Sequence, residues 1–292
     1  MRLLRFARND ICLVIARRPK ADEAIYINMT NRIDKKFKEL KKKNKKAFIA
    51  FIMAGDPSLA ITKKLIHELA DSGADIIELG VPFSDPIADG PTIQKAAERG
   101  LKSKTTLPGV FNLVRNAGLD LETPIVFLIY YNLVFHYGLE KFVKDAVKSG
   151  VDGVVIPDLP PEESKELCKI AKKKRFSIIH LLAPTSSIER IKKVAKASTG
   201  FIYYVSLTGT TGARKKLPKE LSASLKKVKH ITRTPVSVGF GISTRAQVKA
   251  VQKIAAGAIV GSAIVKVIEK NIGKKALVDK VGEFVRKLNN DK

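Results

Sequence analysis

Residues 47–80 read AFIAFIMAGDPSLAITKKLIHELADSGADIIELG, and this stretch decides the fold class. It opens with AFIAFIM (47–53) and closes with DIIELG (75–80), two short apolar runs that are continuous, as in strands buried on both faces. Between them, Ile61, Leu65 and Leu69 recur at the spacing of one helical face. A buried strand, a helix and a second buried strand predict a parallel βαβ unit.

The same unit recurs along the rest of the chain. Six further apolar runs alternate with helical segments: PIVFLIY (124–130), VDGVVIP (151–157), FSIIHLL (176–182), GFIYYVS (200–206), PVSVGF (235–240) and AAGAIVG (255–261). Eight units in about 245 residues predict a single-domain (β/α)8 TIM barrel. The competing architecture is a doubly wound sheet. It is less favoured because GFGIST (239–244) lacks the third glycine of a dinucleotide-binding GxGxxG and no GxxxxGK[ST] occurs.

The composition is that of a globular protein apart from its charge. Of the 292 residues, 45% are hydrophobic and 28% charged, which excludes disorder over most of the length. The two cysteines, Cys12 and Cys168, form neither a CxxC nor a zinc-binding spacing, so we expect a reducing, cytoplasmic compartment. No apolar run approaches the ~18 residues of a membrane span, and we expect no membrane association.

The net charge of +26 suggests, taken alone, a partner with a phosphate backbone or an anionic membrane. Its distribution points elsewhere. Residues 1–46 hold fifteen basic and five acidic residues, and many other lysines, such as Lys165, Lys169 and Lys172, lie on the polar faces of predicted helices. We interpret them as a solvated surface and predict no nucleic-acid partner.

The N-terminal segment differs from the rest. Residues 1–28 hold several arginines around a short apolar run (11–16) that is too short for a good secretory signal. After Met29, residues 30–46 predict an amphipathic helix with Ile33, Phe37 and Leu40 on one face. We therefore expect residues 1–28 to be an extension outside the fold, and residues 29–292 to form the barrel.

Active sites of such barrels lie at the carboxyl ends of the strands. Glu78 stands in a predicted buried strand, where a carboxylate is costly unless it is paired or used. The loop VPFSDPIADGPTIQ (81–94) follows, with Asp89 eleven residues after Glu78. Two carboxyl groups in different environments suit acid–base chemistry. The alternatives are an outward-facing or core-bonded Glu78, and a simple turn and helix start at Asp89.

Glycine-bearing loops follow the last three predicted strands: TGTTGA (208–213), GFGIS (239–243) and GSA (261–263). Glycine lets backbone N–H groups approach an anion, and a helix that begins at Ser262 would add its positive dipole end. Each loop alone is equally well explained by turn glycines, but three together predict a phosphate site. The four histidines are scattered and show no metal-ligand spacing.

Seven segments occur in an order that resembles the tryptophan synthase alpha chain family: FIMAGDP, ADIIELGVPFSDPIADGPTIQ, YYNLVFHYG, DLPPEE, YVSLTGTTGAR, VGFGIS and GAIVGSAIVK. The resemblance covers about residues 30–288. It implies a (β/α)8 barrel that cleaves indole-3-glycerol phosphate to indole and glyceraldehyde 3-phosphate, with no metal or cofactor of its own. It also implies a beta-subunit partner in an α2β2 heterotetramer, with pyridoxal phosphate only on that partner.

The resemblance also implies roles for individual residues. Glu78 matches the acid–base glutamate, Asp89 the aspartate that binds the indole N–H, and Tyr203 a tyrosine near the reacting glycerol chain. The implied substrate-binding residues are the apolar Phe51 and Leu128, the loop residue Thr211, and the phosphate-loop residues Gly212, Gly241, Gly261 and Ser262. Met53 departs from the family, where a threonine is common.

Two rival functions remain open from sequence. Another phosphate-binding barrel enzyme, such as a sugar-phosphate isomerase, would keep the late glycine loops but need not keep Glu78 and Asp89. A basic nucleic-acid binder would show salt-sensitive affinity for DNA or RNA.

Overall fold

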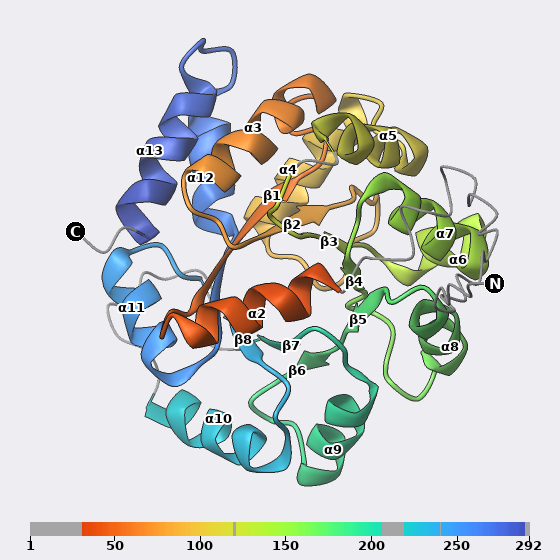
Figure 1. The fold of residues 1–292 in the computed structure, drawn as a ribbon. Helices are drawn as coiled ribbons and strands as arrows, with labels where there is room; N and C mark the ends of the chain where they lie inside the picture. The colour runs from red at the N-terminus through yellow and green to blue at the C-terminus, as the bar shows by residue number, and fades with distance from the viewer. Residues whose placement is uncertain (1–30, 119–120, 206–218, 240, 290–292) are drawn as a thin grey trace, which may run out of the picture. The chain divides into compact units, whose positions relative to one another are not determined.

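The computed structural model describes residues 31–118, 121–205, 219–239 and 241–289 (Figure 1). These residues belong to one compact unit that begins at Asn31. The extension expected at residues 1–28 lies outside the described part, so that expectation stays a prediction. Among the helices of the described part, none combines the length and hydropathy of a membrane span.

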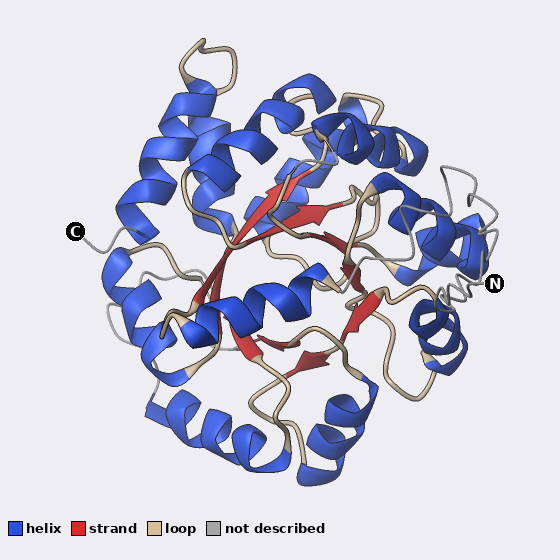
Figure 2. Ribbon diagram, in the orientation of Figure 1, coloured by secondary structure: helices blue, strands red, loops and turns tan. Residues whose placement is uncertain are grey.

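The strands of the described residues form one parallel sheet in the order β5-β4-β3-β2-β1-β9-β8-β7-β6. The two end strands, β5 and β6, have only His180 between them in the chain, so the sheet curls into a nearly closed barrel (Figure 2). This confirms the (β/α)8 barrel and sets aside the doubly wound sheet. The strands are β1 (Ala47–Met53), β2 (Ile76–Gly80), β3 (Ile125–Leu128), β4 (Gly153–Val155), β5 (Ser177–Ile179), β6 (Leu181–Leu182), β7 (Ile202–Val205), β8 (Val236–Gly239) and β9 (Gly257–Val260).

The eight predicted strands are all present, but their limits differ. The run at 176–182 is interrupted at His180, which divides it into β5 and β6. The run at 151–157 pairs only over 153–155. Apolar residues beyond the paired segment, such as Val151 and Ile156, are still buried, because they pack in the loops at the strand ends. Apolar runs therefore predict burial more closely than they predict strand length.

Helices surround the sheet (Figure 1). Several begin at a serine or threonine whose hydroxyl accepts a backbone N–H of the first turn, as Ser58, Thr106, Ser187 and Thr244 do. The helices are α2 (Arg32–Lys42), α3 (Leu59–Asp71), α4 (Pro91–Lys102), α5 (Leu107–Ala117), α6 (Tyr131–Tyr137), α7 (Leu139–Ser149), α8 (Lys165–Lys173), α9 (Ile188–Ala197), α10 (Lys219–Ile231), α11 (Arg245–Ile254), α12 (Ser262–Asn271) and α13 (Leu277–Asn289).

The core has two layers, because successive strand residues point to opposite faces of the sheet. Ile77 and Leu79 belong to the outer layer between sheet and helices. Ile49 and Ile76 belong to the inner layer, inside the barrel. This alternation places Glu78, two residues after Ile76, on the interior face.

Helix α2 closes the amino end of the barrel. Its buried residues are Ile33, Phe37 and Leu40, which pack on the inner layer and confirm the predicted amphipathic face. Arg32 anchors it: the guanidinium contacts both carboxylate oxygens of Asp152 at 2.7 and 2.8 Å and the Leu121 carbonyl at 2.6 Å. Burial raises the pKa of Asp152, and Arg32 opposes that rise.

Replacing Arg32 by alanine is expected to lower the free energy of unfolding by about 3 kcal/mol, because it leaves a buried carboxylate without its cation. Urea denaturation measures this. Lys35→Ala is the control, since the one ion pair of Lys35 with a described residue is an exposed contact with Glu39 at 4.0 Å; we expect a change below about 0.5 kcal/mol. Equal effects of the two substitutions would contradict a structural role for Arg32.

Candidate active site

Glu78 lies inside the barrel on β2. Its side chain is 2% exposed, and both carboxyl oxygens lack a hydrogen-bond partner among the described residues. Burial, and then the charge of Asp89, raise its pKa from 4.5 to about 8. The alternative of an outward-facing glutamate is therefore wrong, and no side chain or backbone group of the described residues satisfies Glu78 as a core-bonded glutamate. A pKa of about 8 keeps the Glu78 carboxyl protonated at neutral pH.

Asp89 lies on the loop that follows β2. Its Oδ2 accepts a hydrogen bond from the Tyr130 hydroxyl at 3.1 Å, and its carbonyl accepts one from Gln94 Nε2 at 2.8 Å. Burial raises the pKa of this half-buried carboxyl, and the Tyr130 hydrogen bond lowers it. The simpler interpretation of this segment is also correct, since Gly90 caps α4 and Pro91 begins it.

Tyr203 lies on β7 and completes a group of three ionisable side chains. Burial raises its pKa well above the ordinary value, and the charges of Glu78 and Asp89 raise it further. Those interactions show that the structure brings Glu78, Asp89 and Tyr203 together. Gly239 makes room for the phenol, because a Cβ there would lie 2.6 Å from Tyr203 Cε1 and 2.7 Å from its hydroxyl.

Apolar side chains line the site beside Glu78. Phe51 pairs in register with Glu78 across β1 and β2, and Leu128 pairs with Gly80 across β2 and β3. Phe51, Met53 and Leu128 belong to one apolar cluster. Met53, the residue that departs from the family, contacts Gly80: a Cβ on that glycine would lie 2.9 Å from the Met53 sulfur.

The residues expected to bind phosphate are described in part. Gly241 (φ +30°) follows β8, and Gly261 caps α12, whose first residue is Ser262. Because β8 and β9 are neighbouring parallel strands, both segments lie at the carboxyl end of the barrel. No side chain caps α12, which suits an anion at its N-terminus. Thr211 and Gly212 lie outside the described residues.

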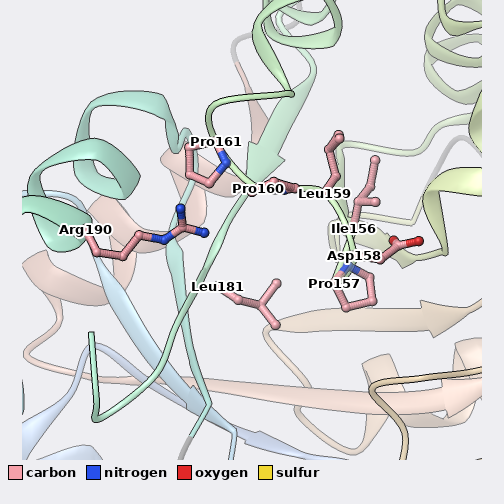
Figure 3. A pocket seen from close by; sticks show the side chains of 8 residues that line it. All are labelled: Ile156, Pro157, Asp158, Leu159, Pro160, Pro161, Leu181 and Arg190. Carbon is pink, nitrogen blue, oxygen red and sulfur yellow. The ribbon is translucent and has the colours of Figure 1, made fainter. Parts of the chain in front are cut away.

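Two residues near the site were missed by reasoning on residue types. Tyr130 contacts Asp89, and Asp158 accepts the Tyr131 N–H at 2.9 and 3.1 Å. Asp158 borders a hollow of about 130 Å³ with Leu181, which pairs with Tyr203 (Figure 3). The signal that could have found both is a polar or aromatic residue at the carboxyl end of a buried apolar run: Tyr130 ends the run at 124–130, and Asp158 follows the run at 151–157.

The described residues contain no group of three or more His, Cys, Asp or Glu side chains able to hold a metal ion. The carboxyl end of the barrel offers two carboxyl groups whose pKa burial raises, Glu78 and the hydrogen-bonded Asp89, together with a tyrosine and an apolar wall. This set can move protons on an aromatic substrate.

The family model for the tryptophan synthase alpha chain matches residues 37–292. The chain belongs to the tryptophan synthase alpha chain family. A tryptophan synthase alpha chain from Geotalea uraniireducens is 50% identical over 258 residues, covering 88% of this chain and 96% of that one. One from Thermoanaerobacter sp. (strain X514) is 44% identical over 88% of this chain and 98% of its own.

Solved structures agree with this membership of the tryptophan synthase alpha chain family. The alpha subunit from Legionella pneumophila str. Paris aligns with a TM-score of 0.83 at 39% identity, covering 89% of this chain and 97% of that chain. A chain of the tryptophan synthase a2b2 complex from Pyrococcus furiosus aligns with a TM-score of 0.78 at 40% identity, over 83% and 97%. The resemblance read from the seven segments is therefore confirmed.

Proposed function

We propose that Glu78 and Asp89 carry out the reaction of the family in this chain, the retro-aldol cleavage of indole-3-glycerol phosphate to indole and glyceraldehyde 3-phosphate. The chain is a carbon–carbon lyase of L-tryptophan biosynthesis. The observation that carries the residue assignment is the pair of carboxyl groups itself. Glu78 is buried and has its pKa raised to about 8, while Asp89 is half-buried and bonded to a tyrosine hydroxyl.

The two groups divide the proton chemistry between them. Protonated Glu78 gives its proton to indole C3, and the positive charge that develops on the ring is stabilised by the Asp89 carboxylate at the indole N–H. The Glu78 carboxylate then takes the proton of the glycerol hydroxyl. The carbon–carbon bond breaks, its electron pair returns to the ring, and the aldehyde forms with Glu78 protonated again.

The other predicted site residues bind the substrate in this proposal. Phe51 and Leu128 contact the indole ring, and Tyr203 lies by the glycerol chain. The phosphate is held by backbone N–H groups of the last loops, which include Thr211, Gly212, Gly241, Gly261 and Ser262. Support for this comes from the common position of the described loops at the carboxyl end of the barrel.

We propose further that the chain works with a tryptophan synthase beta subunit in an α2β2 heterotetramer, as the Pyrococcus furiosus relative does in its a2b2 complex. Loop 81–90 presents Ile87, 81% exposed, near the site where indole would leave. The alpha chain needs no cofactor in this scheme, and pyridoxal phosphate belongs to the partner. The cysteine usage supports a cytoplasmic location.

Incubation of the purified chain with indole-3-glycerol phosphate tests the proposal by the release of indole. We expect indole and glyceraldehyde 3-phosphate in equal amounts, and a higher rate when a beta subunit is added. A chain that leaves this substrate intact in both conditions would refute the proposed function.

The pH profile of indole release is expected to be bell-shaped. Activity requires protonated Glu78, so kcat/KM should fall as pH rises through about 8, far above the ordinary value of 4.5. On the acid side it should fall as Asp89 takes up a proton. Initial rates over the full pH range of stability measure both limbs. If kcat/KM did not begin to fall below pH ~9.5, the role of Glu78 as the acid would be contradicted.

A further inference from the structure

Tyr130 lies between β3 and α6, and its hydroxyl reaches the loop that carries Asp89. The ring is 3% exposed. The hydroxyl accepts the Ala88 N–H at 3.0 Å and lies 3.1 Å from Asp89 Oδ2. A phenol has a single proton, and an N–H can only donate. The Tyr130 proton therefore points to the Asp89 carboxylate.

The same side chain holds the loop at a second point. The Phe83 ring stacks on Tyr130 with centroids 5.2 Å apart and planes at 29°. Between these two contacts the loop turns outward, where Ser84, Asp85 and Ile87 are exposed. Tyr130 thus contacts this exposed loop at both of its ends, at Phe83 and at Ala88–Asp89.

Asp158 fixes the position of Tyr130 in turn. Its two carboxylate oxygens accept the N–H of Tyr131, the first residue of α6, at 2.9 and 3.1 Å. The Ile129 N–H bonds to the Val155 carbonyl at 3.1 Å, so the backbone on both sides of Tyr130 is tied to β4 and its loop. Figure 3 shows Asp158 on this loop. Burial raises the pKa of Tyr130, so it remains a donor wherever the enzyme is active.

We propose that Tyr130 is a positioning residue for the cleavage reaction: its hydroxyl holds the Asp89 carboxylate on the indole N–H, and Asp158 holds Tyr130. This rests on the proposed function of Asp89. Loss of the hydroxyl leaves the substrate-binding walls intact, so it lowers kcat more than it changes KM. It also removes a hydrogen bond that stabilises the charged form of Asp89. The pKa of Asp89 then rises, and the acid limb of the pH profile moves to higher pH.

Tyr130→Phe tests the proposal, with indole release from indole-3-glycerol phosphate as the assay. We expect kcat to fall about tenfold, the magnitude of a lost hydrogen bond to a charged group, with KM changed less than about threefold. The acid limb should move to higher pH. Tyr137→Phe is the matched control, because Tyr137, the last residue of α6, also donates its hydroxyl to a carboxylate, Asp145 at 2.7 Å. We expect that control to keep kcat and the acid limb of the wild type.

A double-mutant cycle separates this proposal from the proposed function. Once Asp89→Asn has removed the charge, adding Tyr130→Phe should change kcat by less than about twofold. The positioning role would be overturned if the two substitutions lowered kcat by factors that multiply in the double variant. It would also be overturned if the acid limb of Tyr130→Phe stayed at the wild-type pH. Either result would leave the proposed function standing. A wild-type chain that releases no indole would instead refute the function.

Thermal unfolding establishes that each variant is folded before its rates are compared. If Tyr130→Phe does not fold, Phe83→Leu replaces it, since this change removes the stacked ring and keeps both hydrogen bonds of Tyr130. It should lower kcat in the same direction by a smaller factor. An unchanged kcat in Phe83→Leu would then count against the proposal.

Discussion

Replacing Glu78 by glutamine is expected to lower the rate of indole release at least ~10²-fold, the usual contribution of a positioned acid or base. The amide has the size of the carboxyl group but can neither give a proton to indole C3 nor take one from the glycerol hydroxyl. The loss should appear in kcat, since the apolar wall formed by Phe51 and Leu128 is untouched. Steady-state kinetics with indole-3-glycerol phosphate measure it.

The fold of Glu78→Gln should remain intact. The wild-type carboxyl has its pKa raised to about 8 by burial, so the folded state loses stability as pH rises from 4.5 toward 8. An uncharged amide avoids that loss, and we expect no decrease in melting temperature at neutral pH. Glu39→Gln on α2, at the opposite end of the barrel, is the matched control and should keep wild-type rates. Full activity of Glu78→Gln would remove this residue from the mechanism.

Replacing Asp89 by asparagine is expected to lower indole release by a similar factor, at least ~10²-fold. Asparagine keeps the shape of the side chain and an oxygen that can still accept from Tyr130. What it removes is the negative charge opposite the ring nitrogen, where positive charge develops after C3 is protonated. The measurement is kcat for the chain without a partner, which excludes effects on subunit association.

Asp85→Asn is the control for Asp89, because it makes the same change four residues earlier on the same loop. Asp85 is exposed, and within the described part of the chain its carboxylate accepts a hydrogen bond from the neighbouring Ser84 hydroxyl and from no other group. We expect less than about a threefold change in kcat. Comparable losses in both variants would mean that the total charge of the loop matters rather than the position of Asp89.

The arrangement of strands and helices was predictable because each strand is buried on both faces and so reads as a continuous apolar run. His180 is a position at which the apolar run did not predict the end of a strand. It falls inside the run at 176–182 and separates β5 from β6, although it is itself buried. Its pKa is lowered to about 4, chiefly by burial, which keeps it neutral, and a neutral imidazole bonded to Ser164 at 3.0 Å is compatible with the core. Residue type alone does not distinguish it from a loop histidine.

By itself the sequence determined the barrel, the family and the identity of the two carboxyl groups, because periodicity and residue order are properties of the chain. Only the tertiary structure decided that Glu78 faces into the barrel with no hydrogen-bond partner among the described residues, because the side a strand residue faces depends on how the sheet packs between the two layers of the core. It alone brought Tyr130 to Asp89, 41 residues earlier, and Asp158 to Tyr131, 27 residues earlier. Parallel strands end at one rim of the barrel, so loops far apart in the chain meet there, and their side chains acquire the contacts that set their protonation.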